Sequence, residues 1–129
     1  MAVRSGVRQV LENHLTPQLR SGRLVLREVP GTGGAEAVVI SRLVRVEVAL
    51  ADGVLEGWVR SGPLEDLPAV PLDAAIGVFG LRVPDGRDHA GLLFGLVDDL
   101  ERLEDAAQTR ESWLLLLERS DMMDTVARW

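Results

Sequence analysis

Hydrophobic and polar residues alternate most regularly over residues 44–60, and this stretch predicts the centre of the fold. Apolar residues take every second position from Val44 to Leu50, with arginine, glutamate and alanine between them. A period of two is typical of a strand that buries one face. Asp52-Gly53 follows, a pair that favours a two-residue hairpin turn because both central residues of a type I′ turn need positive φ.

A two-residue turn also fixes which residues lie opposite one another in the hairpin. The predicted apolar pairs are Leu50 with Leu55, Val48 with Gly57 and Val46 with Val59. On the other face, the predicted pairs are Ala49 with Glu56, Glu47 with Trp58 and Arg45 with Arg60. The hairpin therefore predicts an antiparallel sheet with one dry face and one polar face.

The residues before the hairpin predict one helix and two strands. A helix capped by Ser5 carries an apolar stripe, is interrupted at Thr16-Pro17 and stops at Ser21-Gly22. Extended segments follow at 23–29 and 37–40, joined by a glycine-rich turn. The stripe of the helix consists of Val7, Val10, Leu11 and Leu15.

The residues after the hairpin begin with a proline-containing loop at 61–71. Residues 74–81 are apolar on both faces and predict a buried central strand. Asp88 is expected to cap an acidic helix with a continuous apolar stripe, and a last helix spans 110–119 before a break or a new helix cap at Ser120-Asp121. The stripe comprises Leu93, Leu96, Val97, Leu100, Leu103 and Ala107; the predicted polar surface holds Asp98, Asp99, Glu101, Arg102, Glu104 and Asp105.

Together these elements predict an α+β fold with a single antiparallel sheet of about five strands. The N-terminal helix and the C-terminal helices are expected to pack on one face of the sheet. We interpret residues 1–129 as one domain, in which 110–129 form a terminal helical segment.

Composition narrows the classes of function. Cysteine is absent, which excludes disulfides, thiolate metal sites and a cysteine nucleophile and agrees with a cytoplasmic location. No signal peptide or membrane-spanning apolar run is evident. Residues 1–60 carry a net charge of +2 and residues 61–129 a net charge of −8, with arginine the only basic residue apart from histidine. Such an acidic second half argues against nucleic-acid binding and is typical of a solvated acidic surface.

No motif predicts catalysis, a metal or a cofactor. Residues 31–34 are glycine-rich but lack the lysine and the following helix of a phosphate-binding loop. His14 and His89 have no ligand spacing, and Asp85-Gly86-Arg87-Asp88 is better explained as a turn and a helix cap. A small-molecule ligand stays an open alternative without an identified site.

The tryptophans provide the strongest candidate for an interaction surface. Trp58 falls on the predicted polar face, where the last helix, a second protomer or a ligand would have to cover it. The terminal segment is apolar over more than one face, which favours a partner helix and predicts a homodimer built from residues 110–129. The predicted interaction residues are Trp58, Trp113, Leu116, Leu117, Met122, Met123 and Trp129.

Residues 75–106 resemble the closing strand and helix of GAF domains. Ile76-Gly77-Val78 matches a "GVLGL"-type strand, and Leu92 to Ala106 matches the leucine- and alanine-spaced helix that finishes that fold. The resemblance implies a sensory module of the GAF or Roadblock type. The nucleotide-binding motif of the family is not present, and no cysteine is available to hold a bilin.

Two functional hypotheses follow. The first is a non-enzymatic regulatory or sensory module that dimerises through its C-terminal helices. The second is a small acidic chaperone or adaptor that holds a partner protein on its exposed sheet. An enzyme is the least favoured alternative.

Overall fold

The predicted hairpin forms with the predicted register. β3 (Val44–Ala51) and β4 (Val54–Ser61) pair antiparallel, and every predicted pair from Leu50–Leu55 to Arg45–Arg60 is present. Asp52 and Gly53 have φ angles of 52° and 79°, as the turn requires. The structure is a computed structural model that describes residues 5–28, 37–80, 85 and 87–127.

Three shorter strands extend the hairpin into a five-stranded antiparallel sheet. The strands follow one another in space as they do in sequence, β1-β2-β3-β4-β5. They are β1 (Val25–Glu28), β2 (Ala37–Ile40) and β5 (Val70–Pro71), in addition to the hairpin. The described helices are α1 (Ser5–Ser21), α2 (Leu72–Gly80), α3 (His89–Asp98), α4 (Leu100–Ala106) and α5 (Arg110–Ala127).

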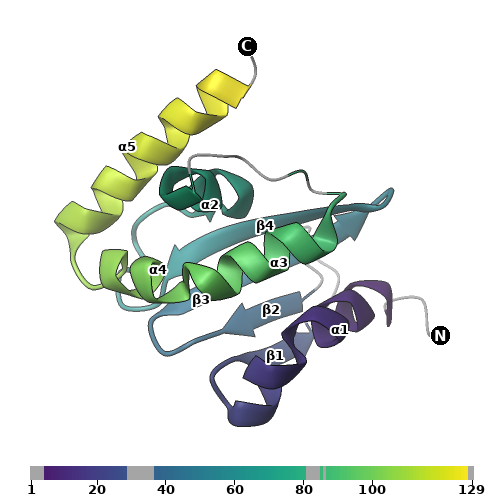
Figure 1. Cartoon of the computed structure of the whole chain (residues 1–129). Coiled ribbons are helices and arrows are strands. Elements are labelled where there is room, and N and C mark those ends of the chain that lie inside the picture. The colour runs from purple at the N-terminus through teal and green to yellow at the C-terminus, as the bar shows by residue number, and fades with distance from the viewer. Residues whose placement is uncertain (1–4, 29–36, 81–84, 86, 128–129) are drawn as a thin grey trace.

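The helices lie on one side of the sheet, and α5 packs against α2 and β5 (Figure 1). Burial alternates along β3 accordingly: Val44, Val46 and Val48 are buried, whereas Arg45 is exposed. The predicted α+β class, with its N-terminal and C-terminal helices beside one antiparallel sheet, is confirmed. We call the side of the sheet that bears Arg45 and Trp58 the outer face.

The predicted interruption of the first helix at Thr16-Pro17 is wrong. α1 continues through Pro17 to Ser21, where Gly22 adopts a φ of 79°. Proline removes the backbone donor that would reach the carbonyl four residues earlier, and its ring crowds that carbonyl, at a cost of about 3 kcal/mol. Leu15 is fully buried and Leu19 packs on the core, so burial on both sides of Pro17 holds the helix together.

The predicted central strand at 74–81 is also wrong, because residues 72–80 form α2. The Asp73 carboxylate accepts a hydrogen bond from the Ala74 amide at 2.8 Å at the start of this helix. α2 contacts β4 on one side and α3 and α5 on others, which explains why it is apolar all round. The strand that completes the sheet is instead β5, where Pro71 is confined to an edge.

The acidic helix and the last helix differ from prediction in where they break. Asp88 does cap α3, accepting a hydrogen bond from the Gly91 amide at 2.9 Å, but the helix ends at Asp98 and α4 begins at Leu100. The predicted break at Ser120-Asp121 does not occur, since α5 runs continuously to Ala127. Asp99 and Glu104, predicted on the polar surface, are buried at 7% and 6% exposure.

Gly57 allows the two layers to meet. A Cβ atom added there would lie 2.8 Å from Leu72 Cδ2 and 2.9 Å from Leu72 Cβ. The second of these atoms is fixed to the backbone of α2, so it cannot move aside without shifting the helix. The sheet and α2 therefore touch through a position that only glycine fits.

We expect Gly57→Ala to destabilise the fold by about 1–3 kcal/mol, the usual effect of overpacking. Gly80→Ala is the matched control, since a Cβ there meets no described atom within 4 Å. Urea denaturation of both variants measures the difference. Equal midpoints for the two would show that α2 does not rest on Gly57.

Candidate functional site

The structure divides the predicted interaction residues of the last helix between the core and the surface. Trp113 is fully buried, and its indole Nε1 donates a hydrogen bond to the Pro68 carbonyl at 3.0 Å. Leu116 is buried at 3% exposure. These two side chains attach α5 to the rest of the domain, so the expectation that both lie on an accessible surface is corrected.

The remaining predicted residues of the last helix are more accessible. Met122 is 63% exposed, and Leu117 and Met123 are half-buried. Trp129 lies outside the described residues. Sequence reasoning missed Leu114 and Leu115, which are 46% and 45% exposed. Their signal was the four-leucine run itself, since four consecutive helical residues point in four directions.

Trp58 lies on the outer face, as predicted, and is half-buried. It pairs with Glu47 on β3 and with Pro71 on β5, so one row of side chains crosses the sheet from β3 to its edge. Glu47 also pairs with Val38 of β2, so the row continues onto that strand. The described helices lie on the other side of the sheet (Figure 1), and α5 approaches the row only at Pro71.

The outer face is more basic than the rest of the molecule. Register places Arg27, Arg45 and Arg60 on it together with Glu47 and Glu56. Arg60 Nε lies 2.7 Å from Glu47 Oε1. Arg27 and Arg45 are exposed, and neither forms a salt bridge within the described part of the chain. A chain with a formal net charge of −6 thus carries a locally positive sheet surface.

A groove of about 480 Å³ separates α5 from β5. Pro68, Ala69 and Pro71 line one wall, and Leu117 and Ser120 belong to the other. The Ser120 hydroxyl is buried without a hydrogen-bond partner in the described structure. Pro71 of the edge strand β5 therefore has two neighbours. It pairs with Trp58 of β4 on one side and lines the groove to α5 on the other.

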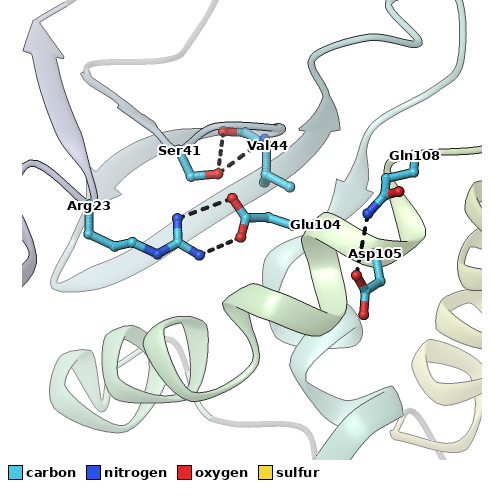
Figure 2. Close-up of polar contacts among 6 residues, drawn as sticks. All are labelled: Arg23, Ser41, Val44, Glu104, Asp105 and Gln108. Atoms are coloured by element: carbon cyan, nitrogen blue, oxygen red, sulfur yellow. Dashed lines mark hydrogen bonds and ion pairs between the residues drawn. The ribbon is translucent and has the colours of Figure 1, made fainter.

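A cavity of about 730 Å³ lies at the end of the sheet beside α4. Its most buried charged residue is Glu104, which accepts hydrogen bonds from both terminal nitrogens of Arg23, one of them at 3.1 Å (Figure 2). Ser41 lies beside the pair, and its hydroxyl also closes the β2–β3 turn by accepting from the Val44 amide at 3.1 Å. Glu101, Arg42 and Asp105 line the more open part of the cavity.

The electrostatics of this cavity are those of an internally neutralised pair. Hydrogen bonds from Arg23 lower the pKa of the Glu104 carboxyl below its ordinary value, while burial acts in the opposite direction. The same contact raises the pKa of Arg23. The cavity has the volume of a small-ligand site, about 300–1,000 Å³. However, its buried polar groups already satisfy one another, so the arrangement fastens α4 to the start of β1.

Each histidine contacts a backbone carbonyl in the described structure. His14 Nδ1 lies 2.8 Å from the carbonyl of Val10, within its own helix. His89 Nε2 lies 2.8 Å from the Gly53 carbonyl and links α3 to the hairpin turn. The described residues contain no group of three or more side chains able to hold a metal ion.

Comparison with protein-family models, with curated proteins and with solved structures found no match to this chain. The GAF-like resemblance therefore stays a prediction, and the strand that it included is helical in this structure. Among the described helices, none has the length and apolarity needed to cross a membrane.

Trp113→Ala should cost about 3–5 kcal/mol, as expected for a large buried aromatic residue. Leu115→Ala, on the exposed side of the same helix, should change stability far less. Thermal unfolding followed by circular dichroism measures both variants. A folded Trp113→Ala protein with an unchanged midpoint would place Trp113 outside the core.

Arg23→Gln should leave Glu104 as an uncompensated buried charge and cost about 1–3 kcal/mol at pH 7. This loss is smaller than that for a fully buried ion pair because the Arg23 side chain is 37% exposed. Because folding lowers the pKa of Glu104, the ionised carboxylate stabilises the folded state at pH values above its ordinary pKa of 4.5. This stabilisation is lost as the pH falls from 4.5 through the lower pKa of the folded state. The deficit of the variant should therefore shrink at pH 4.

Arg110→Gln is the matched control for this pair, because Arg110 bridges to Asp66 at the surface, where both side chains are more than half exposed. We expect little change from it at either pH. Urea midpoints at pH 7 and pH 4 compare the two variants. An Arg23→Gln deficit that is the same at both pH values would mean that Glu104 does not titrate as inferred.

Proposed function

We propose that this chain is a non-enzymatic protein-interaction module that binds a partner protein on the outer face of its sheet. The observation that carries the proposal is the one-sided packing of the sheet, with Trp58 half-buried on the face that no described helix covers. Exposed apolar surface that is rimmed by charge commonly marks a binding site. Tryptophan and arginine are also the residues most enriched at binding hot spots.

The polar groups that lie close together in the described structure favour a structural role over catalysis. The Ser61 hydroxyl donates to the Ala107 carbonyl at 2.9 Å and accepts from the Leu64 amide at 3.1 Å. Glu104 is neutralised by Arg23, and each histidine contacts a backbone carbonyl. An adaptor or chaperone needs a surface rather than a reactive centre. The lack of cysteine in all 129 residues agrees with the cytoplasmic location that we propose.

A regulatory or sensory module that dimerises through α5 is the second candidate. It is favoured by the exposed side of that helix, where Leu114, Leu115 and Met122 are among the most exposed large apolar side chains of the described structure. These residues replace Trp113 and Leu116 in the predicted interface. The range 110–129 is therefore kept as the dimerisation element of this second candidate.

The test of the first candidate compares two aromatic residues in binding to proteins from the source cell. Phe94 on α3 is 52% exposed and lies on the helical side, so Phe94→Ala is the matched control for Trp58→Ala. We expect the immobilised wild type and Phe94→Ala to retain the same partner, and Trp58→Ala to lose it while keeping its circular dichroism spectrum. Equal retention by all three proteins would exclude Trp58 from the binding site.

A further inference from the structure

The exposed side of α5 is an acidic and apolar stripe. Glu111, Leu115, Glu118 and Met122 follow one another at spacings of four, three and four residues, so they share one face of the helix. All four are exposed, and Leu114 flanks them. Trp113 and Leu116 are buried on the opposite side. Arg119 is an exposed basic residue beside the stripe.

The outer face of the sheet has the complementary composition. Trp58 and the half-buried Ile40 provide apolar surface, and Val25, which pairs with Ile40, is 45% exposed. Arg27 and Arg45 provide positive charge that no salt bridge within the described residues neutralises, and the exposed Glu56 is the acidic residue beside them that is also without such a salt bridge. A helix with glutamates beside leucine and methionine matches this face both in charge and in hydrophobicity.

The α5 stripe and the Trp58 end of the outer face approach the same edge of the molecule, whereas Arg27 lies on β1 at the opposite edge of the sheet. α5 packs against β5, and Pro71 of β5 pairs with Trp58 on the outer face while lining the groove with Leu117 of α5 (Figure 1). A two-fold axis near this edge would bring the α5 stripe of each copy toward the outer face of the other. Such an exchange closes after two copies and uses both complementary contacts twice.

We propose that the partner on the outer face is a second copy of this chain, with the α5 stripe of each protomer lying across the outer face of the other. This inference rests on the proposed function, because it names the occupant of the same surface. It differs from pairing of α5 with α5, since like-charged glutamate stripes would then face one another. It also supplies a cover for Trp58 that the single chain lacks.

Charge reversal tests the arrangement. A sheet variant carries Arg27→Glu with Arg45→Glu, and a helix variant carries Glu111→Arg with Glu118→Arg; all four positions are exposed. By sedimentation equilibrium at tens of micromolar, the wild type should be a dimer. Each variant alone should dimerise about tenfold more weakly or worse, because like charges meet at both contacts. Asp98→Arg, an exposed reversal on α3, is the control and should leave the dimer intact.

A one-to-one mixture of the two variants gives the decisive result. The acidic helix of the sheet variant meets the basic sheet of the helix variant, and the basic helix meets the acidic sheet, so both contacts are restored. We therefore expect the mixture to form a heterodimer about as readily as the wild type dimerises, although each variant alone dimerises at least about tenfold more weakly. Circular dichroism confirms that each variant is folded before mixing.

The inference is overturned by a monomeric wild type, by a mixture that stays monomeric, or by a ladder of larger species in place of a closed dimer. A sheet variant that dimerises normally points instead to α5 against α5. The proposed function is tested separately by Trp58→Ala and the retained partner. A monomeric wild type whose binding to another protein depends on Trp58 would remove the second copy and leave the interaction module standing.

Discussion

The contact of Leu72 with the bare backbone of Gly57 is the constraint on which the two layers depend. It places α2 directly on β4, and α2 in turn is covered by α3 and α5. Because α5 rests on this second layer, Trp113 and Leu116 become core residues and the opposite side of the helix is left at the surface. One close approach therefore decides both what stabilises the domain and which part of its last helix is available to a partner.

The hairpin could be predicted residue by residue because its signals are local. Alternation from Val44 to Leu50 defines a face, and Asp52-Gly53 fixes the register without reference to any other element. Residues 74–81 lack such a signal. A strand buried on both faces and a short helix buried on all sides are equally apolar, and choosing between them requires knowing that Val70–Pro71 already completes the sheet.

Among the candidate site residues, those whose position depends on neighbours in the sequence could be predicted, and those whose partners lie far away in the sequence could not. Trp58 was placed on the correct face because its position follows from the register of the hairpin. Glu104 was assigned to the solvent because it belongs to an acidic run, whereas its partner Arg23 lies 81 residues earlier in the chain. No spacing rule connects two residues so far apart. Trp113 was misplaced for the same reason, since its hydrogen-bond acceptor, the Pro68 carbonyl, lies on the loop before β5.

The uneven charge along the sequence acquires a spatial meaning in this fold. Residues 1–60, with a net charge of +2, contain α1 and the strands β1 to β4, whereas residues 61–129, with a net charge of −8, contain α2 to α5. Charge asymmetry along the chain is therefore largely an asymmetry between the sheet and the helices that follow it. Within one copy, the outer face and the α5 stripe point into solvent and cannot neutralise one another. Between copies they can, and an attraction of this origin acts over about 10 Å at moderate salt, far enough to orient two chains before they touch.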